Sequence, residues 1–202
     1  MQHATDPTPV SSQRFAVVDV ETSGLDVERH HVLQVGIVTV DGNGTVLDRW
    51  SSLVAPRSRF WFRVGPTKIH GIRRRDVRTA PSAAVVFSEL ARRMQGCRFV
   101  AHNAEFDLGF LRKAAQSVGV ELPLDNPVCT LQLSRRLDPE RTTSHRLADL
   151  CERYGVTLTK AHDALADAEA TAGILPHLLR AHQIVSVDQL PPMTFGRRQR
   201  AS

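Results

Sequence analysis

Two carboxylates two residues apart, Asp19 and Glu21, follow a short apolar run near the start of the chain. Side chains alternate across an extended strand, so residues i and i+2 project to the same face. Two carboxylates on one face repel each other, and a cation is needed to offset that repulsion. The pair is therefore a candidate metal site, with the alternative that the strand has already ended and both acids are solvated.

Asp107 is a further candidate, because it follows a polar loop and lies in the first turn of an expected helix. The apolar stripe of that helix is formed by Phe106, Phe110 and Leu111, which recur at helical spacing. An acid in a first turn also interacts favourably with the helix dipole. By itself, Asp107 would be assigned that structural role.

His162 and Asp167 form the last group, at the start of an alanine-rich helix. Five helical residues rotate by about 500°, or about 140° net, so the two side chains would not share one face of a continuous helix. If both serve one site, His162 must lie on the preceding loop, which makes Asp163 a natural N-cap. Asp163 also shares a helix face with Asp167, so it is the competing ligand.

Taken together, three segments resemble the exonuclease motifs of the DEDDh (DnaQ-like) superfamily. They are 19–25 (DVETSGL), 102–107 (HNAEFD) and 162–167 (HDALAD), and the resemblance extends over about residues 14–180. The motifs look closest to the exonuclease domain of the DNA polymerase III epsilon subunit, and 68–72 (KIHGI) resembles a segment between its first two motifs. The related group with a tyrosine four residues before the last aspartate fits less well, because position 163 is aspartate.

The resemblance implies a ribonuclease H-like fold and a 3′→5′ exonuclease that uses two divalent ions, Mg²⁺ or Mn²⁺. Hard divalent cations prefer carboxylate oxygens, and two ions about 3.5–4 Å apart clamp the attacking and leaving oxygens of an in-line displacement. Asp19 is expected to bridge both ions. Glu21 and Asp167 would hold the ion on the nucleophile side, and Asp107 the other. His162 is expected to be the general base on the attacking water, with 5′-mononucleotides as products.

Residues around the motifs are expected to contact the substrate. The turn at Gly24 lets the backbone approach the terminal nucleotide, and Leu25 is a candidate wedge against the last base. Phe106 is a candidate stacking side chain. For Leu25 and Phe106 the alternative is core packing, and for His70 it is a structural role. His102 and Asn103 would either touch a phosphate or orient the second motif. The expected substrate contacts are Thr22, Ser23, Gly24, Leu25, His70, His102, Asn103 and Phe106.

The elements that must position these residues alternate in type along the chain. Apolar runs predict strands at 14–20, 32–40, 45–54, 98–101 and 128–131. Helical spacing predicts helices from about 82 to 95 and at 106–118, 144–154 and 163–180, whereas 55–80 is expected to be irregular. This order predicts an α/β fold, with a mixed central sheet of about five strands, the first three antiparallel, flanked by α-helices.

Length and composition suit one exonuclease domain at 14–182, between a disordered leader (1–13) and a basic Pro- and Arg-rich tail (183–202). The net charge of +5 favours a polyanionic partner such as nucleic acid. The three cysteines form no CxxC pair, which argues against a zinc site built on thiolates. No apolar run approaches the roughly 20 residues that span a bilayer, so no membrane partner is expected and the cytoplasm is the default location.

We expect the substrate to be the 3′ end of single-stranded DNA, in proofreading or repair. RNA or short oligonucleotides are the alternative, because contacts to the 2′-hydroxyl come from backbone and pocket shape. An inactive nucleic-acid-binding module would have lost a carboxylate, and all are present. A DNA polymerase or a sliding clamp is a candidate partner, the clamp from a weak likeness of 189–195 (QLPPMTF) to a clamp-binding peptide.

The segment from Arg57 to Arg78 carries eight Lys or Arg and one acid, Asp76. If it contacts the substrate backbone, neutralising Arg73, Arg74 and Arg75 removes phosphate contacts, and each contact contributes about 0.7 to the salt slope for a single strand. We expect affinity for single strands to fall steeply with salt in the wild type and less steeply in the triple variant. An unchanged slope in a salt titration would remove this segment from the substrate path.

Overall fold

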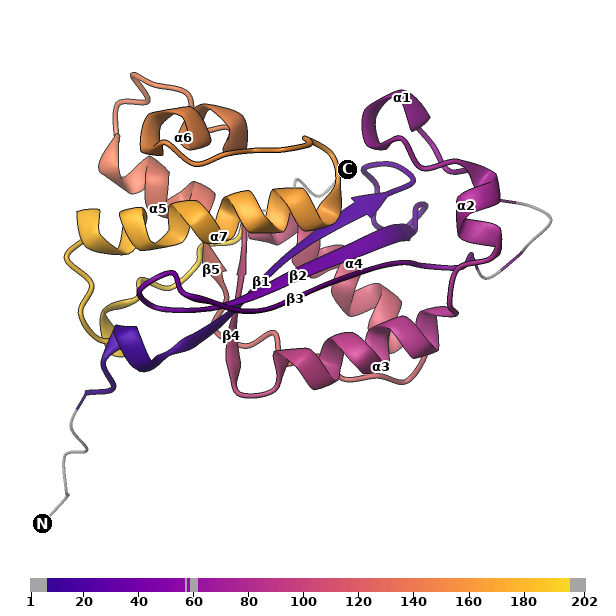
Figure 1. Ribbon diagram of the computed structural model, residues 1–202, viewed down its shortest axis with the longest axis horizontal. Coiled ribbons are helices and arrows are strands. Elements are labelled where there is room, and N and C mark those ends of the chain that lie inside the picture. The colour runs from indigo at the N-terminus through magenta and orange to yellow at the C-terminus, as the bar shows by residue number, and fades with distance from the viewer. Residues whose placement is uncertain (1–6, 57, 59–61, 197–202) are drawn as a thin grey trace, which may run out of the picture.

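A mixed five-stranded sheet with the order β3–β2–β1–β4–β5 forms the centre of the computed structural model, which describes residues 7–56, 58 and 62–196 (Figure 1). The strands are β1 (Arg14–Thr22), β2 (Val32–Asp41), β3 (Val46–Leu53), β4 (Cys97–Ala101) and β5 (Val128–Cys129). The pairs β1–β2 and β2–β3 are antiparallel, whereas β1–β4 and β4–β5 are parallel. The predicted mixed sheet, with its first three strands antiparallel, is confirmed.

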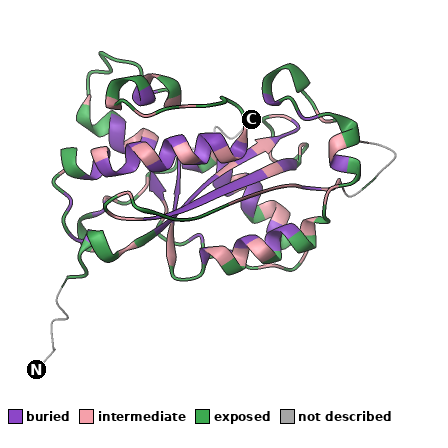
Figure 2. Cartoon of the chain, in the orientation of Figure 1, coloured by how far each residue is buried: buried purple, intermediate pink, exposed green. Residues whose placement is uncertain are grey.

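The central strands are buried on both faces because their sequences are continuously apolar rather than alternating. Residues 15–18 of β1 are all buried, and every residue of β2 is buried except Gln34 and Asp41, which are partly buried. The buried character of these central strands is visible in Figure 2. In contrast, β3 is an edge strand. Its first four residues, 46–49, are exposed and the other four are partly buried. Its charged residues Asp48 and Arg49 form ion pairs with the helices, and charges on an edge strand discourage pairing with another chain.

Helices cover both faces of the sheet (Figure 1). One face packs against α7 (Ala164–Ala181), with α5 (Thr130–Leu137) and α6 (Leu147–Tyr154) beside it. The other face packs against α3 (Ala83–Met94) and α4 (Ala104–Gln116). In the described part of the chain, no helix combines the length and apolar character needed to cross a membrane.

Three predicted segments differ from the structure. The strand expected at 128–131 ends at Cys129, and α5 begins at Thr130. The segment 55–80 contains two short helices, α1 (Thr67–His70) and α2 (Arg74–Arg78), which are too short to show a 3.6-residue period in sequence. The helix expected from 144 begins at Leu147, because Ser144 bonds the Asp149 side chain and Arg146 occupies the N-cap position.

Parts of both predicted flanking segments pack against the domain. Pro9 and Ser186 form an isolated bridge, and the backbone N–H of Val10 donates to Val185 O at 2.9 Å. Ile184 and Leu190 are buried in the same core cluster as Val10. Apolar side chains in these otherwise polar segments explain the packing. Residues 1–6 and 197–202 lie outside the described residues, and the domain boundaries stay predictions.

Gly36 in β2 allows the start of α7 to rest directly on the sheet. A Cβ atom built on Gly36 would lie 2.2 Å from Ala164 O and 2.5 Å from Leu165 N, both backbone atoms that cannot rotate away. The preceding inward position, Gln34, accepts a hydrogen bond from Ala164 N through Oε1 at 3.3 Å. Because Gly36 is also the cross-strand partner of Asp19, this contact sets the distance between the first and last motifs.

We therefore expect Gly36→Ala to displace the start of α7, at a cost of about 1–3 kcal/mol, as is typical of overpacking. A thermal melt should show a lower Tm, and nuclease activity should fall with it because Asp167 moves away from Asp19. Ser51→Ala is the matched control, since Ser51 pairs with Gly36 from β3 and loses an atom rather than gaining one. A Gly36→Ala protein with wild-type Tm and activity would contradict the role of this contact.

Candidate active site

Asp19 and Glu21 lie on one face at the C-terminal end of β1, as their spacing predicts. The strand continues to Thr22, so the alternative in which both acids lie beyond the strand is wrong. Directly paired residues of neighbouring strands point to the same face, and the Cβ direction of Gly36 points at α7. Asp19, which pairs with Gly36, therefore faces the start of α7.

Asp107 reaches the same strand end from the helical layer on the other face of the sheet. It is buried in the first turn of α4, next to the backbone of Val20. Its charge acts on Asp19, and so does that of Asp167. The carboxylates from the two layers thus converge at the C-terminal end of β1.

The last motif contributes one helical and one loop residue. The first residue of α7 is Ala164, and Asp163 is its N-cap, accepting from Leu165 N at 3.2 Å and Ala166 N at 3.4 Å. The second oxygen of Asp163 accepts from Lys160 Nζ at 3.0 Å. Because both oxygens of Asp163 have partners, Asp167 is the better-placed ligand of the two.

His162 lies on the loop before α7, as required for it to reach the site of Asp167. Its backbone has a left-handed conformation, with φ of 63°, and its N–H donates to Asp167 Oδ2 at 3.0 Å. A left-handed conformation is unusual for a residue other than glycine, and surrounding contacts must hold it. Ligand atoms of Glu21, His162 and Asp167 all lie within 4.8 Å of one another, so these three could hold a metal ion.

The carboxylates of the site are difficult to ionise together. Burial, and then the charges of Asp107 and Asp167, raise the pKa of Asp19 well above its ordinary value. Burial and the charge of Asp167 raise the pKa of Glu21 to about 7. Burial raises the pKa of Asp107 to about 8, against opposing backbone hydrogen bonds. Burial also raises the pKa of Asp167, although His162 opposes the rise. Such a set of hard oxygen donors fits divalent cations, which would replace protons as the neutralising charge.

The turn after β1 is held by its own hydrogen bonds. Thr22 Oγ1 donates to Gly24 O at 2.7 Å, and Ser23 exchanges two bonds with His31, through Ser23 N and Ser23 Oγ. A Cβ on Gly24 would contact the ring of His30 at 2.6 Å. Leu25 is 84% exposed at this turn. The core-packing alternative for Leu25 is therefore wrong, whereas its role as a wedge stays a prediction.

The predicted substrate contacts outside the first motif differ in how far they are exposed to solvent. His70 is buried and uses both ring nitrogens inside its own loop, with Val64 O and Ile72 N, each at 3.0 Å. His102 contacts Thr130 Oγ1 at 3.0 Å, and burial lowers its pKa to about 4. Asn103 is exposed at the start of α4, with φ of 64°. Phe106 is partly buried and packs on Phe110, with the ring centroids 4.9 Å apart.

Two residues that position the site were missed from sequence. They are Gly36 and Gln34, which receive the start of α7 on β2. A glycine inside a strand often marks a close approach of another backbone, and a polar residue in an apolar run marks a buried hydrogen bond. Both signals were present in 32–40 (VLQVGIVTV).

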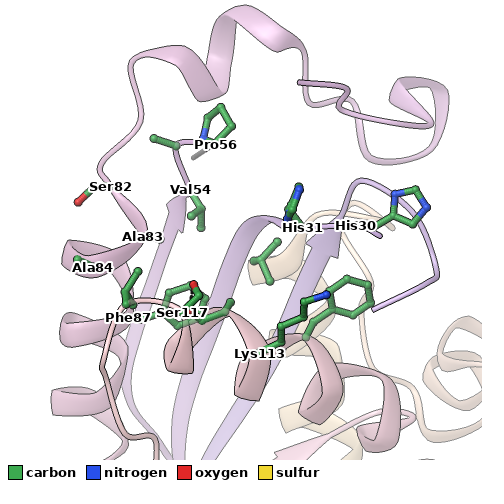
Figure 3. Close-up of a pocket in the computed structure, with 15 residues that line it drawn as sticks. His30, His31, Val54, Pro56, Ser82, Ala83, Ala84, Phe87, Lys113 and Ser117 are labelled. Atoms are coloured by element: carbon green, nitrogen blue, oxygen red, sulfur yellow. Dashed lines mark hydrogen bonds between the residues drawn. The ribbon is translucent and has the colours of Figure 1, made fainter. Parts of the chain in front are cut away.

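An apolar hollow of about 410 Å³ lies between α3, α4 and the ends of β2 and β3 (Figure 3). Val54, Phe87 and Phe110 line it, and His30, His31 and Lys113 lie at its edge. No carboxylate is among the described residues that line it. It offers no ligand set for a metal and is not the candidate active site.

Comparison with protein families finds that the exonuclease family matches residues 16–175. The chain is 34% identical over 172 residues to a PolC-type DNA polymerase III of Bacillus cereus, covering 85% of this chain and 12% of that protein. It is 28% identical over 185 residues to the 3′-5′ exonuclease DinG of Staphylococcus aureus, covering 92% and 20%. The chain thus spans a small part of the length of these relatives.

Among solved structures, E. coli exonuclease I in complex with a dT13 oligonucleotide is similar, with a TM-score of 0.71 and 20% identity over 83% of this chain and 41% of that one. Exonuclease X in complex with 5′ overhanging duplex DNA has a TM-score of 0.68 and 25% identity, covering 88% of this chain and 96% of that one. These similarities confirm the predicted ribonuclease H-like fold.

The raised carboxyl pKa values predict how the metal-free protein responds to pH. Glu21 and Asp107 bind protons more tightly folded than unfolded, so their contribution to stability is present at about pH 4 and is lost as the pH rises to about 8. In chelator, the Tm should therefore fall over this range. Asp107→Asn should raise the Tm at pH 8, by about 2–4 °C for each kcal/mol of repulsion removed.

Glu169→Gln is the control for this experiment, because Glu169 is a carboxylate of α7 that is paired with Arg49 at the surface. It should not raise the Tm. An Asp107→Asn protein that melts at or below the wild-type temperature at pH 8 would show that repulsion at this site does not limit stability.

Proposed function

The chain belongs to the exonuclease family, and from this membership we propose that it is a metal-dependent 3′→5′ exonuclease acting on single-stranded DNA. Membership confirms the resemblance to the DnaQ-like superfamily that the three motifs suggested. The observation that carries the proposal is the convergence of four carboxylates and one exposed histidine, from three distant chain segments, at the end of β1.

Asp19, Glu21, Asp107 and Asp167 would hold two divalent ions, Mg²⁺ or Mn²⁺, which would supply charge stabilisation for an in-line displacement at phosphorus. The donor set supports this assignment, because it is made of hard oxygen ligands whose ionisation burial and mutual repulsion oppose. His162 differs from the acids in being exposed, so water and substrate can reach its ring.

His162 is the proposed general base. It removes a proton from the attacking water while the water oxygen bonds to the phosphorus of the terminal phosphodiester. The bond from phosphorus to the 3′-oxygen of the preceding nucleotide breaks, and the product is a 5′-mononucleotide. The bond from His162 N–H to Asp167 and the N-cap at Asp163 orient the loop that carries the base. Leu25 is proposed to contact the terminal base, and its 84% exposure supports this role.

Support for DNA as the substrate comes from the relatives, which include PolC-type DNA polymerases and structures bound to DNA oligonucleotides. An exoribonuclease remains the second candidate. Association with a DNA polymerase is proposed from the PolC relatives, and a cytoplasmic location from their part in replication. The clamp-peptide hypothesis for 189–195 gains no support, because Leu190 is buried and Thr194 bonds Gln132.

The proposal is tested by digesting 5′-labelled single-stranded DNA and RNA of matched sequence with magnesium, manganese or chelator. The wild type should give a ladder that shortens from the 3′ end only with metal, and faster on DNA. Asp19→Ala should abolish it. His162→Ala should lower kcat by about 10²–10⁴-fold, the usual contribution of general base catalysis.

Glu169→Gln again serves as the control and should retain wild-type activity. Binding without degradation by folded wild-type protein in every metal would refute the enzyme assignment in favour of a binding module. Faster digestion of RNA would replace the DNA assignment with the exoribonuclease alternative.

A further inference from the structure

A polar cleft of about 340 Å³ lies between the start of α4, helix α5 and the segment 194–196. It begins beside the second motif, since Asn103 and Glu105 line it and lie four and two residues before Asp107. The residues with catalytic roles proposed above include neither the arginines of this cleft nor its C-terminal segment, 194–196. Arg135, Arg136, Arg141 and Phe195 line the cleft as well.

The charge of this cleft is strongly positive. Arg135, Arg136 and Arg141 are exposed, and none of them forms an ion pair with any carboxylate in the described part of the chain. The one acid of the lining, Glu105, accepts a hydrogen bond from Gly196 N at 3.0 Å. A guanidinium has five donors in a planar fork that matches the oxygens of phosphate. Three such groups without acidic partners are suited to a polyanionic ligand.

The arginines are held by a structured loop. Asp138 accepts from Thr142 N at 3.0 Å and Thr143 N at 2.9 Å, closing the turn after α5. Arg141, inside this turn, has φ of 58° and donates through Nη1 to Arg135 O at 2.6 Å. The turn therefore places Arg141 back against the helix that carries Arg135.

The C-terminal segment 194–196 also lines the cleft and is bonded to α5. Thr194 N donates to Gln132 Oε1 at 2.9 Å, and the Gln132 amide returns a bond to Thr194 O. Arg136 donates to Pro192 O at 2.8 Å. Phe195 lies between the anchored residues Thr194 and Gly196, yet its side chain is 53% exposed. An exposed aromatic ring on an anchored backbone, beside arginines, is the combination that binds single strands by stacking and charge.

We propose that this cleft binds the part of a single-stranded nucleic acid on the 5′ side of the scissile bond, with Arg135, Arg136 and Arg141 on its phosphates and Phe195 stacked on a base. The inference rests on the proposed function, because the strand must have its 3′ end at the carboxylates. The cleft holds the strand upstream of that end and so adds affinity for substrates longer than the one or two nucleotides at the carboxylates.

The first test is fluorescence anisotropy of a labelled oligothymidylate of eight nucleotides, in chelator, where no hydrolysis occurs. Arg135→Gln/Arg141→Gln should bind about 10-fold more weakly near 0.15 M salt, with a salt slope lower by about 1.4, for two lost phosphate contacts. Phe195→Ala should bind about 5- to 150-fold more weakly, the range for one stacked base. Arg135→Lys/Arg141→Lys should keep the wild-type salt slope, because it keeps both charges.

The matched control is Arg112→Gln/Arg180→Gln, which removes two exposed arginines that do not line the cleft. It should bind like the wild type. If the Arg135→Gln/Arg141→Gln protein also has the wild-type affinity and salt slope, the proposal is overturned and an acidic protein is the remaining occupant of the cleft.

Kinetics separate this proposal from the proposed function. For the Arg135→Gln/Arg141→Gln protein, the KM for an octanucleotide should rise about 10-fold with little change in kcat, because the cleft binds upstream of the reacting phosphate. A change confined to kcat would contradict upstream binding. If wild-type protein hydrolyses nothing, the exonuclease proposal fails, whereas the anisotropy result still decides whether the cleft binds nucleic acid.

Discussion

Electrostatic repulsion among four carboxylates, two of them buried and two partly buried, is the constraint on which the rest of this structure depends. Asp19, Glu21, Asp107 and Asp167 act on one another at one end of β1, and burial makes each of them harder to ionise. A protein keeps such a cluster only if the surrounding fold is stable enough to offset it. Here the continuously apolar β1 and β2, covered by helices on both faces, supply that stability.

The start of α7 connects this framework to the reaction. The absence of a side chain at Gly36 brings the helix against the sheet, and the N-cap at Asp163 fixes where the helix begins. Beginning the helix there leaves His162 outside it, in a left-handed conformation held by Asp167. One carboxylate thus both orients the loop of the proposed base and belongs to the proposed metal site.

Two parts of the surface around the site are suited to binding different parts of the strand. After β1, the exposed Leu25 extends from a turn held by Ser23 and His31. Next to the second motif, the cleft between α5 and the C-terminal segment offers arginines and Phe195. This arrangement suits a strand whose last nucleotide is handled at the carboxylates while the preceding nucleotides are held by charge and stacking. The C-terminal segment then functions as part of the domain rather than as a loose tail.

The sequence by itself determined the sheet, the main helices and the membership in the exonuclease family, because long apolar runs and spaced carboxylates are local patterns. The spacing of His162 and Asp167 also required His162 to precede the helix, if both serve one site. Within one continuous helix, their side chains would point in different directions. Only the tertiary structure decided what depends on contacts between distant segments. Gly36 under Ala164, the internal bonds of His70, and the bonds of 192–196 to α4 and α5 are such cases. Some of these contacts join residues that are far apart in the chain. Those of His70 belong to a helix too short to show a helical period in the sequence. A local sequence pattern predicts neither kind of contact.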